Sequence, residues 1–154
     1  MSKFSVTRHV PYSAEQVYAI ASDVASYRHF LPLMKRSDVY NVQMVADGVE
    51  SFDSELNIAY KKLGINETMR SRVTTDRNTR IVTASSGDDG PIKHLVARWQ
   101  IMPEGKGASI ALDIDYTLKS RSLQFLMSGM FDLIMRKVMT AFEERAQKLY
   151  GSKA

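Results

Sequence analysis

The chain has 154 residues and a formal charge of +4, from 21 lysines and arginines against 17 aspartates and glutamates, and it contains no cysteine. This length fits one domain, expected over residues 1–154, that can bury its own core without covalent staples. The missing cysteines exclude disulfides, thiolate metal sites and a cysteine nucleophile. Solvated surface residues explain so mild a charge excess, and we expect no DNA partner.

No segment has the character of a secretion signal or of a membrane span. Residues 1–6 enter an alternating pattern at once and lack an apolar signal core. No stretch approaches the roughly 18 uninterrupted apolar residues that cross a bilayer. We therefore expect a cytoplasmic protein, and a peripheral position at the inner face of the membrane stays open.

The N-terminal region predicts a strand and then a short helix. Apolar and polar residues alternate over residues 4–10, which is the pattern of a strand, and Pro11 ends it. Ser13 stands three residues before Gln16, the spacing of a helix-capping box. A helix over residues 13–23 is the expected result.

A second short helical turn is expected over residues 23–30. It stops before Pro32, because the residue that precedes a proline disfavours the helical conformation. The segment that follows is unusually apolar for a connection, so it either lies under another element or forms the lip of a pocket. Its apolar residues are Tyr27, Phe30, Leu31, Pro32, Leu33 and Met34.

Between residues 35 and 118 the chain reads as successive strands. The alternating stretches are 39–45, 52–58, 65–73, 80–84, 95–101 and 110–118, and residues 85–91 (SSGDDGP) read as a loop. Nearly every stretch has one apolar and one polar side, which is typical of an antiparallel sheet with one solvated face.

A long helix over residues 120–150 is the one element left to cover the apolar face of that sheet, and Gly151 is a plausible residue to end it. Between Leu123 and Met139 its apolar side is wider than one contact stripe. One interpretation is that this half of the helix is buried in a large hydrophobic core, with or without a dimer contact. The other is that it faces a ligand cavity, a membrane or a partner. The expected fold class is α+β: a curved antiparallel sheet of six to seven strands wrapped around a long C-terminal helix, with two short helices after the first strand.

The sequence lacks the motifs of common catalytic and metal sites. His9, His29 and His94 have no short metal-ligand spacing, and we expect no metal. Neither a glycine-rich phosphate loop nor a GxSxG nucleophile motif is present. Asp113 and Asp115 share one side of a strand and read as solvent-facing. We therefore expect no catalytic residue, no cofactor and no enzyme activity.

One carboxylate falls on an apolar face. Alternation places Glu67 between Ile65 and Met69, so either a bulge leaves it exposed or it points inward and pairs with a polar group. An inward Glu67 could hydrogen-bond the head group of a ligand.

Basic residues occur in loose pairs. The pairs are Lys35 and Arg36, Lys61 and Lys62, Arg70 and Arg72, Lys119 and Arg121, and Arg136 and Lys137. The last two pairs flank the most apolar stretch of the long helix, an arrangement that suits an anionic membrane surface or ribosomal RNA. Scattered solvated charge remains the simpler interpretation.

Several segments carry a resemblance to a known family. They are VPYSAEQVY at 10–18, DVASY at 23–27 with FLP at 30–32, RVT at 72–74, GPI at 90–92 with Leu95 and Trp99, and AFEERA at 141–146 before YG at 150–151. Their order and spacing are similar to the coenzyme Q-binding family with the START-like helix-grip fold, which also includes the bacterial ribosome association toxin proteins. Many members carry Trp-Cys after FLP, whereas this chain has Leu33 and Met34, which excludes a role for a thiol or an indole there.

The resemblance implies a non-catalytic protein that binds ubiquinone or a related polyprenyl lipid between sheet and helix and supports respiration as a carrier. On this hypothesis the lipid is the only ligand, and Glu67 contacts its head group. The expected cavity lining is Leu95, Trp99, Met127, Met130, Phe131 and Ile134, with Phe30, Leu31 and Leu33 at the entrance.

Two alternatives come from other functional classes. The first is a ribosome association toxin-type protein that binds the large ribosomal subunit and inhibits translation. The second is an enzyme like the polyketide cyclases and dehydratases of the wider superfamily, which would need polar groups converging in the cavity.

Overall fold

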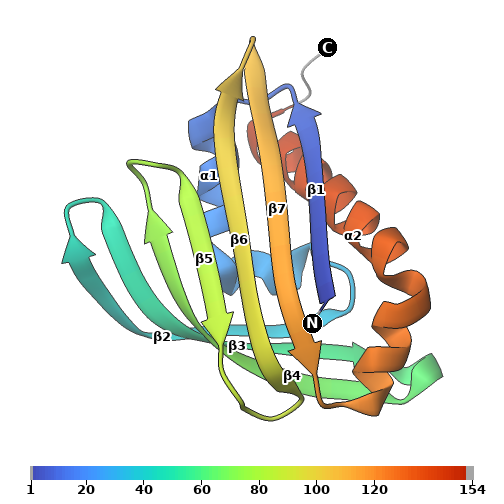
Figure 1. Cartoon of the computed structure of the whole chain (residues 1–154). Helices are drawn as coiled ribbons and strands as arrows, with labels where there is room; N and C mark the ends of the chain where they lie inside the picture. Colours follow the sequence, from blue (N-terminus) through green and yellow to red (C-terminus); the bar gives the residue numbers. More distant parts are fainter. Residues whose placement is uncertain (1, 152–154) are drawn as a thin grey trace.

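The structure is a computed structural model that describes residues 2–151, apart from the side chains of residues 2, 122, 123, 126, 127 and 129–131. Figure 1 shows the path of the chain. In chain order the elements are β1 (Ser2–Val10), α1 (Ala14–Ser22), η1 (Val24–His29), β2 (Met34–Ala46), β3 (Val49–Tyr60), η2 (Lys61–Leu63), β4 (Ile65–Asp76), β5 (Ile81–Ser86), β6 (Ile92–Glu104), β7 (Gly107–Leu118) and α2 (Arg121–Tyr150).

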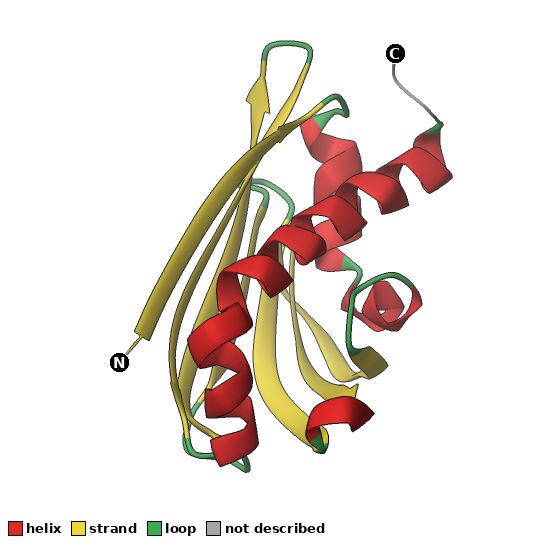
Figure 2. Ribbon diagram, turned by 90° about the vertical axis from the view of Figure 1, so that its right-hand side faces the viewer, coloured by secondary structure: helices red, strands yellow, loops and turns green. Residues whose placement is uncertain are grey.

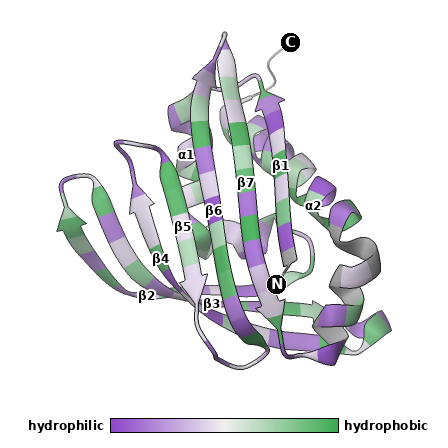
Figure 3. Cartoon of the chain, in the orientation of Figure 1, coloured by the Kyte–Doolittle hydropathy of each residue, from purple (hydrophilic) through white to green (hydrophobic). Residues whose placement is uncertain are grey.

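The seven strands form one antiparallel sheet in the order β1-β7-β6-β5-β4-β3-β2. The sheet curves strongly, so that β2, β3 and β4 run beneath the other strands (Figure 1). The helices α1 and α2 lie on the same side of the sheet (Figure 2). Hydrophobic and hydrophilic residues alternate along β6 and β7 (Figure 3), as a sheet with one solvated face requires. The predicted α+β fold is confirmed.

The first two helices follow β1 as predicted. The capping box is present: Gln16 N donates to Ser13 Oγ and Ser13 N donates to Gln16 Oε1, both at 3.1 Å. The second helix, η1, is a 3₁₀-helix. At the other end of the chain, α2 ends at Tyr150, and the next residue, Gly151, has φ +88° and an N–H that donates to Gln147 O at 2.9 Å.

The start of β2 was predicted wrongly. The strand begins at Met34 and not at residue 39, because Ser37 ties the beginning of the strand to η1. Ser37 Oγ donates to Ala25 O at 2.8 Å and accepts from Arg28 N at 3.1 Å. Residues 35–38 are all polar, so this part of the strand lacks the alternation of apolar and polar residues that predicts a strand. The end of β5 also differs, since the strand runs to Ser86, inside the predicted loop 85–91.

Phe142 of α2 is at the centre of the main core and is 1% exposed. Its ring meets those of Trp99, Phe30 and Tyr27 at centroid distances of 4.6, 5.4 and 6.2 Å. The segment 27–34 is therefore partly tucked under α2. A smaller cluster forms around Ile65, Ile92 and Leu118.

The sheet is incomplete next to the short strand β5. β5 pairs with β4 over residues 72–76, and within the described chain residues 65–71 of β4 pair only with β3. The connection 87–91 passes this place, and Asp89 forms an isolated bridge with Ile92. Among the described residues, no helix is both long and apolar enough to cross a membrane.

Gly107, at the start of β7, offers a test of the packing between this strand and the end of its neighbour β1. A Cβ at this position would lie 2.1 Å from Val10 O, a backbone atom that cannot move aside. We expect Gly107→Ala to lower the free energy of unfolding by about 1–3 kcal/mol, measured as a shift of the urea midpoint. Gly87→Ala is the matched control, because nothing lies within 4 Å of a Cβ there. Equal midpoints for the two variants would contradict the predicted clash.

Candidate functional site

A cavity of about 160 Å³ lies between the concave face of the sheet and η1. It is lined from η1 and from the strands β3, β4, β5 and β6, where the two hydrophobic clusters meet. The lining residues are Val24, Tyr27, Ser54, Leu56, Met69, Ser71, Val73, Val82, Ala84, Ile92, Leu95, Ala97 and Trp99.

Small side chains leave the space for this cavity. Ala84 and Ala97 are register partners on β5 and β6, and Ser54 and Ser71 are register partners on β3 and β4. All four line the cavity, next to larger groups such as Trp99. Because protein interiors otherwise fill to the density of organic crystals, four small residues close together on neighbouring strands leave a void.

Two serine hydroxyls interrupt the apolar lining, and sequence reasoning missed both. Ser54 is 1% exposed and Ser71 is half-buried. The sequence pattern could have identified both, since Ser54 and Ser71 stand at apolar-face positions of the alternating stretches 52–58 and 65–73. A second hollow, of about 280 Å³, lies on the outer face of β3, β4 and β5 and also touches Ser54 and Ser71.

Tyr27 supplies the third hydroxyl of the lining. Its phenol is buried and donates a short hydrogen bond to Ala21 O. Burial, and secondly the charge of Asp23, raise the pKa of this phenol far above its ordinary value. Tyr27 therefore stays a neutral donor at any physiological pH.

The predicted site residues fall in different places. Leu95 and Trp99 line the cavity. Leu33 and Ile134 are half-buried and pack against the smaller cluster, as Leu95 does. The side chains of Met127, Met130 and Phe131 lie outside the described region of the molecule. The assignment of all these residues to a ligand stays a prediction.

Phe30 and Leu31, predicted at the entrance, are half-buried against the main core. The ring of Phe30 packs edge-on against Phe142, and the guanidinium of Arg145 lies 5.3 Å from its centroid. Phe30 therefore holds η1 against α2. Their role as entrance residues also stays a prediction.

Glu67 faces the inner side of the sheet without a bulge, since the register of β3 and β4 is continuous there. Its Oε1 accepts a hydrogen bond from Ser120 Oγ at 2.9 Å. It lines a separate open hollow of about 540 Å³ together with Gly90, Pro91, Lys119, Ser120 and Arg121. This hollow, and not the apolar cavity, holds the carboxylate.

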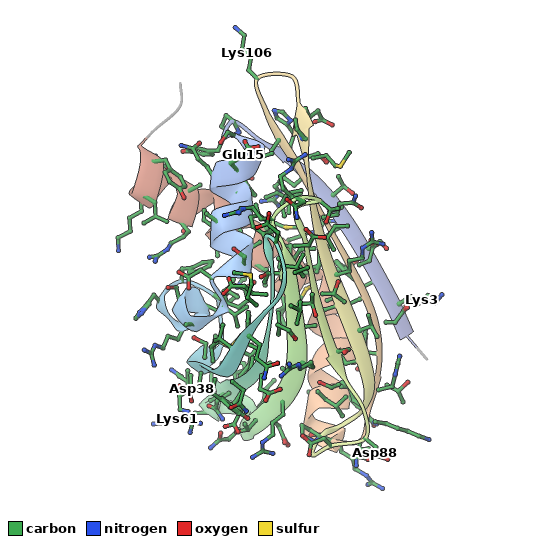
Figure 4. All side chains as sticks on the ribbon, turned by 90° about the vertical axis from the view of Figure 1, so that its left-hand side faces the viewer. Lys3, Glu15, Asp38, Lys61, Asp88 and Lys106 are labelled. Carbon is green, nitrogen blue, oxygen red and sulfur yellow. The ribbon has the colours of Figure 1, made fainter. Side chains whose placement is uncertain are left out.

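The basic pairs divide into neutralised and free charges. Arg72 pairs with Asp53 at 2.9 Å, Arg70 with Glu55 at 3.0 Å, Arg36 with Asp38 at 3.1 Å, and Lys119 with Asp88. The other members of these pairs are exposed and make no ion pair to a described residue: Lys35, Lys61, Lys62, Arg121, Arg136 and Lys137. Lys61 and Asp88 lie at the end of the molecule opposite Lys106 (Figure 4).

Comparisons with known proteins agree with this architecture. The chain is 29% identical to the ribosome association toxin RatA of Escherichia coli K12 over 99% of its own length and 92% of the relative's. It is 28% identical to the mitochondrial coenzyme Q-binding protein of Drosophila melanogaster over 92% of its own length, but it spans only 57% of that longer protein. The solution structure of an 18 kDa protein from Caulobacter crescentus superposes with a TM-score of 0.82, 28% identity and coverage of 99% and 100% of the two chains.

The family model described as polyketide cyclase / dehydrase and lipid transport matches residues 10–143. This range contains every element that lines the cavity and most of α2. The family and the START-like fold expected from the sequence are both confirmed. The chain belongs to the polyketide cyclase/dehydrase and lipid transport family.

Proposed function

We propose that this protein binds a polyprenyl lipid of the ubiquinone class and carries it without reaction, with the ring of the lipid in the cavity. The observation that carries the proposal is an apolar cavity with a few hydroxyl groups on its wall. Binding sites for small molecules combine apolar surface with a small number of placed polar groups in this way.

The size of the cavity fits a ring better than a chain. A cavity of about 150 Å³ lined by aliphatic and aromatic residues can hold a benzene molecule, whereas pockets for drug-sized ligands start at about 300 Å³. With about 160 Å³, the described cavity has room for one ring, and a polyprenyl tail would lie outside it. Any part of that tail that the protein surface covers would contribute roughly 25 cal/mol to binding for each Å² of apolar surface removed from water.

The lining gives no support to the cyclase alternative. Tyr27 is its one titratable residue, and the raised pKa of that phenol keeps it protonated. General acid–base catalysis needs a group that can exchange a proton near neutral pH. Within the described lining, hydroxyls that bind and orient a ligand are the available chemistry.

A carrier must also exchange its lipid with a membrane. On α2, Phe125 is 67% exposed and Leu133 is 51% exposed. Arg136 and Lys137 follow on the same helix and are exposed too. Apolar groups beside cations suit a peripheral contact with an anionic lipid surface.

Filling the cavity tests the proposal. Ala97→Leu would place additional carbons into the space for the ring, and we expect it to reduce the lipid that co-purifies with the protein about tenfold, since overpacking costs about 1–3 kcal/mol. The readout is mass spectrometry of an organic extract after purification without detergent from a quinone-producing host. Ala111→Leu is the control, because Ala111 lies on the outer face of β7.

An isoprenoid quinone in extracts of the wild-type protein and of Ala111→Leu, but not of Ala97→Leu, is the expected result. Single-tryptophan fluorescence verifies that each variant is folded, since Trp99 is the one tryptophan of the chain and is 8% exposed. An empty extract from folded wild-type protein would overturn the proposed function.

Binding to the large ribosomal subunit is the second candidate function. Its support is the name of the RatA relatives, which match almost the whole of both chains. The free bases Lys61, Lys62 and Arg121 could bind ribosomal RNA, whereas Arg70, Arg72 and Lys119 are neutralised by acidic partners.

This candidate predicts salt-dependent co-sedimentation with the large subunit. We expect the double variant Lys61→Glu/Lys62→Glu to bind more weakly and to lower the slope of log K against log salt by about 0.7–0.9 for each phosphate group that the protein no longer neutralises. Lys106→Glu, at the opposite end of the molecule (Figure 4), is the control. Absence of co-sedimentation at low salt would exclude this function.

A further inference from the structure

Three serines form a row across neighbouring strands on the concave face of the sheet. Ser54 of β3 and Ser71 of β4 are register partners, and Ser71 Oγ lies 2.9 Å from Ser86 Oγ of β5. Ser54 and Ser86 are 1% and 8% exposed, and Ser71 is half-buried. Hydroxyl groups on an otherwise apolar wall need partners, because an unpaired buried polar group costs free energy.

The hydrogen bonds fix which serine donates to which. Ser86 Oγ donates to Arg70 O, since a carbonyl oxygen can only accept. A hydroxyl has one proton, so Ser86 must accept in its bond with Ser71, and Ser71 must be the donor there. The proton of Ser71 is therefore engaged, and only its lone pairs remain for a ligand.

Ser54 completes the pattern with a free hydroxyl. It lines the cavity, and its Oγ makes no hydrogen bond to any described residue. Directly opposed side chains on neighbouring antiparallel strands have Cβ atoms about 4.5–5.5 Å apart. One ligand oxygen between Ser54 and Ser71 could therefore reach both, at about 2.7–2.8 Å from each hydroxyl.

We infer that this serine row selects a lipid whose ring carries a hydroxyl, a phenol or hydroquinol, over the fully oxidised quinone. The inference rests on the proposed function and adds the redox state of the ligand to it. A ring hydroxyl accepts from Ser54 and donates to Ser71. A quinone carbonyl has no proton, so it can accept from Ser54 but meets the lone pairs of Ser71.

The test uses an equimolar mixture of the oxidised and reduced forms of a ubiquinone with a two-isoprenoid tail, under anaerobic conditions. After gel filtration, the two forms that the protein retains are extracted and separated by chromatography. We expect the wild-type protein to enrich the reduced form about fivefold to tenfold, the contribution of about one hydrogen bond.

Two variants separate the roles of the serines. Ser71→Ala should bring the ratio of the two forms close to one, while Ser71→Thr, which keeps the hydroxyl, should preserve the enrichment. Ser54→Ala should weaken the binding of both forms and leave their ratio unchanged. Ser85→Ala is the matched control, because Ser85 precedes Ser86 on β5 but is exposed on the outer face.

The outcomes distinguish this inference from the proposed function. Equal retention of the two forms by wild-type protein, or a preference for the quinone, would overturn the inference and leave lipid binding intact. Retention of neither form would overturn the proposed function itself. The ratio measured on the wild-type protein decides the inference even where a variant fails to fold.

Discussion

The packing of Phe142 against three other aromatic rings is the constraint on which the rest of the structure depends. It joins α2 to Trp99 of β6, to Tyr27 of η1 and to Phe30 just after η1, three rings that are far from α2 in the sequence. A fully buried aromatic side chain contributes about 1.5–3 kcal/mol, and each well-oriented aromatic pair contributes about 0.5–1.5 kcal/mol more. The same rings close the cavity, because Tyr27 and Trp99 both belong to its lining. Stability and ligand space therefore share one cluster, and a change that loosens the cluster also reshapes the site.

The polar groups in the cavity wall, and Ser86 beside it, are satisfied in unequal ways. Tyr27 and Ser86 donate to backbone carbonyls of their own neighbourhood, Ala21 and Arg70, and these bonds hold the wall together. Ser71 is engaged on one side only, through Ser86. Ser54 is the hydroxyl of the lining that a guest could satisfy. Most of this wall therefore disfavours polar ligand groups, because burying them there without a partner costs free energy. At Ser54 a polar ligand group finds a hydrogen-bond partner.

Much of the fold could be predicted from the sequence, because the alternation of apolar residues and the capping box at Ser13 are local signals. The start of β2 could not, since Ser37 is held by backbone groups of η1 that only the folded chain brings close. The cavity was harder still. Its place depends on which small residues become neighbours on different strands, and register partners such as Ala84 and Ala97 are 13 positions apart in the chain. Glu67 is the charge that the sequence places on an apolar face, yet the polar groups at the cavity are the uncharged hydroxyls of Ser54, Ser71 and Tyr27.

The short length of β5 affects how a lipid could enter the cavity. Over residues 65–71, the described backbone ladder joins β4 to β3 alone, and the connection 87–91 stands beside it in place of a strand. Separating a pair of strands in the middle of this sheet requires that a whole ladder of backbone hydrogen bonds break. Within the described chain no backbone ladder joins β4 to β6 at this place: the bonds between Asp89 and Ile92 hold the connection to the start of β6, and the side chain of Ser86 holds the end of β5 to Arg70 and Ser71 of β4. A lipid that entered between β4 and β6 here would break fewer backbone hydrogen bonds of the sheet than one that separated two ladder-paired strands, and the strength of this part of the sheet would set the residence time of a lipid that used this route.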